Sequence, residues 1–100
     1  RWAREYAPSA MPPAIAPVAR EARHPFHDAA TRMPGWAAPA EESGVREVRA
    51  QYCGMIGEVD DHVWRIFARL RERGEWDSTL VVVTADHADQ LGDHGLVEKL

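Results

Sequence analysis

An acid and an imidazole stand side by side in this sequence, at Asp86 and His87, shortly after the apolar run 80–83. Open α/β sheets bind their ligands at the carboxyl ends of the strands, which is where these two side chains are expected to lie. A carboxylate oxygen and an imidazole nitrogen are common ligands of a divalent metal ion. The residue types alone leave a second interpretation open, in which both side chains bond nearby backbone groups at the strand end.

The surrounding residues carry a family resemblance. Three parts of the sequence contribute to it, namely residues 77–87 (DSTLVVVTADH), residues 91–95 (LGDHG) and Lys99. Together they resemble the sulfatase branch of the alkaline phosphatase superfamily. The residues ADHADQ at 85–90 and RAQY at 49–52 are most similar to phosphonate monoester hydrolases and their sulfatase relatives, and the resemblance extends over residues 47–100.

This resemblance implies that Asp86 and His87 are metal ligands. A mixed oxygen and imidazole pair favours Mn, Zn or Fe over Mg and Ca, which prefer oxygen ligands. Calcium also stays among the candidates, because relatives with Asn in place of the histidine resemble calcium enzymes. We therefore expect Mn, Ca or Zn at this site, with Mn favoured by the Asp-His pair.

The resemblance also implies a catalytic role for Lys99, which stands where the family has its active-site lysine. Its ammonium group would lie near the sulfuryl or phosphoryl oxygens and the leaving group, where negative charge grows in the transition state. The alternative is a solvated lysine on a loop. Glu98 stands where the family usually has Gly, so it could alter the loop or partly neutralise the charge of Lys99.

The nucleophile that the resemblance implies is a formylglycine made from Cys, or a Ser or Thr, in a Cys/Ser-x-Pro-x-Arg motif. Cys53 lacks that Pro and Arg, so we interpret it as a small buried side chain and expect the nucleophile outside this chain. Asp93 and His94 are expected to order the loop rather than to bind metal. Asp89 is expected to have a structural role.

Composition bounds the function further. The chain has 100 residues, 45% hydrophobic content and a net charge of -4, which is typical of a soluble globular piece. Because the family it resembles runs to several hundred residues, we expect a portion of a longer enzyme. Its scattered arginines predict no nucleic-acid surface, and no stretch is apolar for long enough to span a membrane. A single Cys suits a cytoplasmic protein.

Three kinds of element are expected to position these groups. Residues 1–44 hold all the prolines and are predicted to be an irregular connecting segment, apart from a helical turn near residues 18–23. Residues 45–100 are predicted to form the helix, strand and metal loop of a sulfatase catalytic domain. In the helix, apolar residues recur every three or four positions, Ser43 is the expected N-cap and Gly74 the expected stop. Its charged side carries Arg46, Arg49, Asp61, Arg65, Arg69 and Arg73.

Residues 80–83 are apolar on both faces, which predicts an interior strand of a mostly parallel sheet between helices. The expected fold class is thus α/β, as part of an alkaline-phosphatase-like domain.

The expected function is part of a metal-dependent hydrolase that cleaves sulfate, phosphate or phosphonate esters, with a small-molecule ester as substrate. Its partners would be the rest of the catalytic domain and, in some forms, a second copy in a homo-oligomer; the 100-residue chain alone is expected to be inactive. A two-metal phosphatase or phosphodiesterase of the same superfamily and a non-catalytic piece without a nucleophile are the alternatives.

Overall fold

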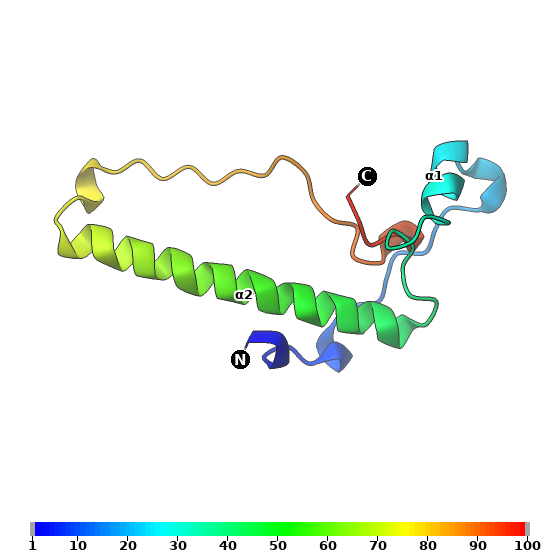
Figure 1. The fold of residues 1–100 in the computed structure, drawn as a ribbon, viewed down its shortest axis with the longest axis horizontal. Coiled ribbons are helices and arrows are strands. Elements are labelled where there is room, and N and C mark those ends of the chain that lie inside the picture. The colour runs from blue at the N-terminus through cyan, green and yellow to red at the C-terminus, as the bar shows by residue number, and fades with distance from the viewer. Residues whose placement is uncertain (1, 100) are drawn as a thin grey trace.

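The structure is a computed structural model that describes residues 2–99. It is elongated, with extents of 58 × 28 × 21 Å, and is dominated by the single long helix α2, Glu42–Glu72 (Figure 1). A shorter helix α1, Pro25–Ala30, precedes it. Five short 3₁₀ helices complete the regular structure: η1 Trp2–Arg4, η2 Pro8–Ala10, η3 Arg20–Ala22, η4 Trp76–Ser78 and η5 Asp93–Gly95. Within residues 2–99, no helix is long and apolar enough to cross a membrane.

The proline-rich segment contains more structure than the sequence predicts. The expected turn is present as η3, but α1 follows it and was not predicted. His24 caps this helix, because its Nδ1 accepts a hydrogen bond from the N–H of Phe26 (3.2 Å), and Pro25 supplies the first helical residue. A proline at that position costs nothing, since its missing N–H would have no partner inside the helix.

Helix α2 begins before its predicted start. Glu41 is the N-cap, its side chain makes no capping hydrogen bond, and Ser43 lies inside the helix, so the prediction of Ser43 as N-cap was wrong. The predicted stop at Gly74 is confirmed. This glycine has a φ of +68° and donates to the carbonyl of Arg71, while the N–H of Glu75 reaches back to Leu70 (2.9 Å). That pair of bonds is the Schellman motif, which favours glycine at this position.

Aromatic packing turns the chain at the end of α2. The rings of Phe67 and Trp76 lie 5.2 Å apart in an edge-to-face arrangement, and Trp64 meets Phe67 in the same way at 6.3 Å. The Arg71 guanidinium lies 3.9 Å from the centre of the Trp76 ring. These contacts fix η4 against the helix, because aromatic edges and cations are both attracted to the face of an indole. The following segment then runs back alongside α2 (Figure 1).

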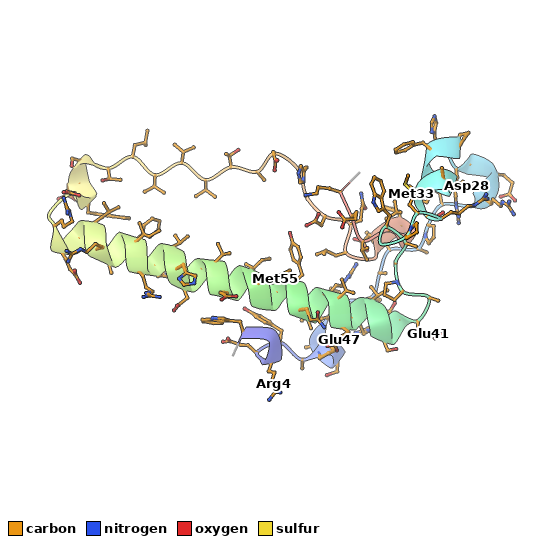
Figure 2. The ribbon with its side chains drawn as sticks, in the orientation of Figure 1. Arg4, Asp28, Met33, Glu41, Glu47 and Met55 are labelled. Atoms are coloured by element: carbon orange, nitrogen blue, oxygen red, sulfur yellow. The ribbon has the colours of Figure 1, made fainter. Side chains whose placement is uncertain are left out.

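The predicted interior strand at residues 80–83 is not seen in the structure. The segment is extended, but among residues 2–99 no other segment pairs with it, and the side chains of Leu80 and Val83 are 86% and 91% exposed. Figure 2 shows side chains standing out on both sides of this segment. A strand of a parallel sheet needs neighbouring strands to accept its backbone hydrogen bonds, and none lies beside this segment among residues 2–99.

The buried core is small and lies at the first half of α2. Ala30, Val45, Ala50 and Leu96 are its buried apolar residues. Trp2 and Tyr6 pack their rings on the helix at Gly57. From Ile56 onward much of the apolar stripe of α2 is uncovered: Ile56, Val59 and Ile66 are all more than half exposed. The core therefore supports the part of the molecule that carries the loop after His87.

Candidate functional site

The Asp86 and His87 side chains face each other at the end of the extended segment. His87 Nε2 lies 3.3 Å from Asp86 Oδ2, and the backbone N–H of His87 donates to the other carboxylate oxygen (3.0 Å). The Asp86 side chain is 86% exposed and that of His87 is 47% exposed. The hydrogen bond from the His87 N–H is of the kind that the capping interpretation expects. The pair is therefore held locally, and both side chains remain exposed to solvent.

These two donors fit a shared metal ion. Bonds from a metal to such donors measure about 2.0–2.2 Å, so two atoms that bind one ion must lie within roughly 4.4 Å of each other. The 3.3 Å separation of Asp86 and His87 meets that limit. Within residues 2–99 no group of three or more His, Cys, Asp or Glu side chains converges, so further ligands would have to come from elsewhere.

The chain after His87 folds into a closed loop, residues 90–98. Backbone N–H groups on its first limb donate to carbonyls on its second: Gln90 to Glu98 (3.2 Å), Leu91 to Val97 (3.4 Å) and Gly92 to Leu96 (2.7 Å). The second limb also forms an antiparallel bridge from Leu96 to Ala37. This closure brings Glu98, the residue before Lys99, back to the start of the loop, three residues after His87, and Lys99 is exposed.

Gly92 lets this loop lie against α2. Its φ is +99°, and a Cβ placed on it would overlap a methyl group of Val45. Only glycine meets both conditions, because other residues resist this backbone conformation and their side chain would need the space of Val45. Leu91 and His94 also have positive φ, at 51° and 56°, so the backbone turns tightly at and around η5, which forms the tip of the loop.

Arg49 lies at the centre of the contacts between α2 and the loop. It is only 9% exposed, so the prediction that it stands on the charged, solvated side of the helix was wrong. Its Nε donates to the carbonyl of Leu91 (2.8 Å) and its Nη2 to Asp93 (2.5 Å), while Nη1 reaches the carbonyls of Pro12 and Pro13. The missed signal was spacing, because Arg49 lies four residues after Val45 and three before Tyr52, on the apolar face.

Asp93 orders the loop, as its sequence position predicts. One carboxylate oxygen accepts hydrogen bonds from the Ile15 N–H (2.7 Å) and from Arg49, and the neighbouring His94 N–H donates to the Ile15 carbonyl (2.8 Å). The hydrogen bond from Ile15 and the Arg49 guanidinium hold the pKa of Asp93 below its ordinary value, although burial opposes them. The carboxylate therefore stays ionised at neutral pH and keeps the bond to Arg49 charged.

Tyr52 forms the second link between α2 and this region. Its hydroxyl donates to the carboxylate of Asp89, and this hydrogen bond, together with burial, raises the pKa of the Tyr52 phenol. Asp89 therefore has a contact that ties the chain between His87 and the loop to the helix. Cys53, the next residue of α2, is half-buried with a free thiol.

The chain is similar to several known proteins. A family model described as Sulfatase matches residues 4–99. The multifunctional alkaline phosphatase superfamily protein PehA of Trinickia caryophylli is 50% identical over 66 residues, which cover 66% of this chain and 13% of that protein. Arylsulfatase K of Danio rerio is 31% identical over 71 residues, covering 71% of this chain and 14% of that protein.

A solved structure is similar over almost the whole chain. The phosphonate monoester hydrolase SpPMH from Silicibacter pomeroyi superimposes with a TM-score of 0.77 and 36% sequence identity, over 95% of this chain and 21% of that one. The chain thus spans between an eighth and a quarter of the length of the relatives it matches.

Proposed function

Because the chain belongs to the sulfatase family, whose model matches residues 4–99, we propose that it forms part of a metal-dependent hydrolase of sulfate, phosphate or phosphonate esters. The observation that carries the proposal is the facing pair of Asp86 Oδ2 and His87 Nε2, 3.3 Å apart at the end of an extended segment. One fold can support many functions, so the chemistry of these two side chains supports the proposal more directly than the fold does.

Asp86 and His87 are proposed to hold the ion through one carboxylate oxygen and one imidazole nitrogen. His87 must be neutral to do so, since a protonated imidazole has no lone pair for a metal. A divalent ion there supplies positive charge for the nucleophile and for the oxygens of the ester. The local hydrogen bond from the His87 N–H to Asp86 orients the carboxylate before any ligand binds.

Lys99 is proposed to act on the leaving-group side. The bond between Gln90 and Glu98 supports this role, because it joins the residue before Lys99 to the chain three residues after His87, and the exposure of Lys99 leaves the ammonium group able to meet a substrate. A fixed positive charge at this place stabilises the negative charge that grows on the departing oxygen. The nucleophile, a formylglycine in the family pattern, is proposed to come from residues outside these hundred.

The extended segment 80–83 is proposed to become the interior strand when the rest of the sheet is present. Its apolar side chains point to both sides and are exposed here, and so is the apolar stripe of α2 from Ile56 onward. Covering such surfaces is strongly favourable, at about 25 cal/mol per Å² of apolar area. The phosphonate monoester hydrolase with which 95% of the chain superimposes supports this arrangement.

Turnover assays on the full-length protein test this function. We expect hydrolysis of an aryl sulfate or a phosphonate monoester, loss of activity on chelation and its return with Mn²⁺.

The isolated residues 1–100 are expected to show no turnover and no sharp calorimetric transition, because the small core leaves most apolar side chains in water. Hydrolysis by the full-length protein that resists exhaustive chelation would overturn metal dependence, and activity in the isolated chain would overturn the need for an outside nucleophile.

A further inference from the structure

Arg49 joins two distant segments through one buried guanidinium group. All three of its side-chain nitrogens donate hydrogen bonds, to Leu91 and Asp93 in the loop 90–98 and to the carbonyls of Pro12 and Pro13 near the N-terminus. A buried guanidinium group is costly to remove from water unless its donors are bonded and its charge is met. Here the Asp93 carboxylate pairs with the positive charge, and each side-chain nitrogen of Arg49 has an acceptor in this arrangement of the loop.

The partners of Arg49 lie in the loop that brings Lys99 into place. Leu91 is on the first limb and donates its own N–H to Val97 on the second limb, so fixing its carbonyl also fixes the ladder that leads to Lys99. Asp93 is at the tip and holds the Ile15 N–H with the same oxygen that Arg49 binds. Arg49 therefore restrains both the limb and the tip of the loop.

Tyr52 restrains the other end of the same region. It lies three residues after Arg49, hence on the same face of α2, and binds Asp89 at the start of the loop. Two side chains of one rigid helix thus hold the chain at Asp89 and again at Asp93. His87 stands two residues before this held stretch, and Lys99 follows the second limb of the loop, which is bonded back to the first limb through Val97 and Glu98.

We propose that Arg49 is a positioning residue, which acts through the loop 90–98 to hold Lys99 at the Asp86–His87 pair. This inference deepens the proposed function and rests on it. The planar guanidinium has donors in fixed directions and can satisfy acceptors on two sides at once, which a lysine ammonium on a flexible stem cannot do in the same geometry. Its charge and shape therefore both matter to the shape of the loop.

The test uses the full-length protein with a matched control. Arg49→Met removes the contacts with the loop. Arg46→Met removes another arginine of α2, which binds Glu42 (3.0 Å) and the Met11 carbonyl but makes no ion pair or hydrogen bond with the loop. We expect Arg49→Met to lower kcat by about 10²-fold with KM changed less than about 3-fold, since a displaced Lys99 loses an interaction of the transition state. Arg46→Met is expected to keep kcat within about 3-fold.

Two readouts separate positioning from a general loss of structure. The double variant Arg49→Met/Lys99→Ala should be no slower than Lys99→Ala by more than about 3-fold, because residues that act as a unit are not additive. Amide hydrogen exchange at Leu91 and Gly92, which donate across the loop, should speed up in Arg49→Met and not in Arg46→Met. Should Arg49→Met fail to fold, the same readouts are taken on Arg49→Lys, which keeps the charge.

The outcomes distinguish this inference from the function beneath it. A full-length protein without esterase activity would refute the proposed function. An active protein in which Arg49→Met matches Arg46→Met, or in which its loss simply multiplies that of Lys99→Ala, would overturn only the positioning role. Coupled losses together with faster exchange in the loop would support it.

Discussion

Replacing His87 with alanine in the full-length protein is expected to weaken metal binding by about 100-fold or more and to remove most of the activity. The estimate is a lower bound, because even groups that only orient a metal ligand contribute about 10–100-fold to metal affinity. Asp86→Asn should act in the same direction, since a neutral amide oxygen replaces a charged carboxylate oxygen. Elemental analysis after dialysis against graded chelator concentrations gives the affinity of each variant.

The control for this experiment is His62→Ala. It removes an exposed imidazole from α2, 25 residues before His87 and outside the loop 90–98. It should keep the metal content and the activity of the parent. If His87→Ala and Asp86→Asn also keep full metal content and affinity, the facing pair is a capped chain end, and the hydrogen bond from the His87 N–H is its whole role.

Lys99→Ala is expected to slow the chemical step by about 10²-fold or more while leaving metal content unchanged, because a charge that meets the transition state is lost. The loss should be larger for poor leaving groups than for nitrophenolate, whose departing oxygen needs less stabilisation. Single-turnover rates across a series of leaving groups measure both effects. Lys99→Arg keeps the charge and should recover part of the rate.

Two further variants sharpen the role of Lys99. Arg65→Ala removes an exposed cation from α2 and should have no effect on the chemical step. Glu98→Gly replaces the acid beside Lys99 with the residue usual in the family, and it should raise the rate if Glu98 partly neutralises the ammonium group. A parental single-turnover rate for Lys99→Ala with every leaving group would make Lys99 a solvated loop residue.

The parts of the fold that the sequence predicts well are those set by local chemistry. The stop of α2 at Gly74 is one, because a positive φ and two backbone hydrogen bonds are decided within six residues. Its start was placed wrongly at Ser43, because the helix begins without a side-chain cap and the capping rule then gives no signal. Helix α1 was missed because it is short, and His24 is not a usual N-cap residue.

The strand at residues 80–83 shows why some predictions need the rest of the molecule. An apolar run on both faces indicates burial, but a strand exists only with a neighbour to pair with, and none is present among residues 2–99. Arg49 shows a different failure. Its charge suggested a solvated face, whereas its spacing from Val45 and Tyr52 placed it on the buried one, and only the loop's carbonyls explain why a charge belongs there.

The candidate site divides in the same way. The residue types of Asp86 and His87 left two interpretations open, and the family resemblance implied metal ligation. The structure adds that the two donor atoms lie 3.3 Å apart, while ligation itself stays a prediction. The return of the chain toward residue 90 just before Lys99 depends on backbone bonds across a loop with several positive φ angles. Such a closure is not encoded by any single spacing, because it also needs the packing of Gly92 on Val45.

Anomalous diffraction from crystals of the full-length protein grown with Mn²⁺ tests the central claim most directly. The claim predicts one anomalous peak bonded to both Asp86 Oδ2 and His87 Nε2, at about 2.0–2.2 Å from each, with the Lys99 ammonium group near the bound ion. A peak bonded to other residues, with Asp86 and His87 still paired only with each other as in this structure, would contradict it.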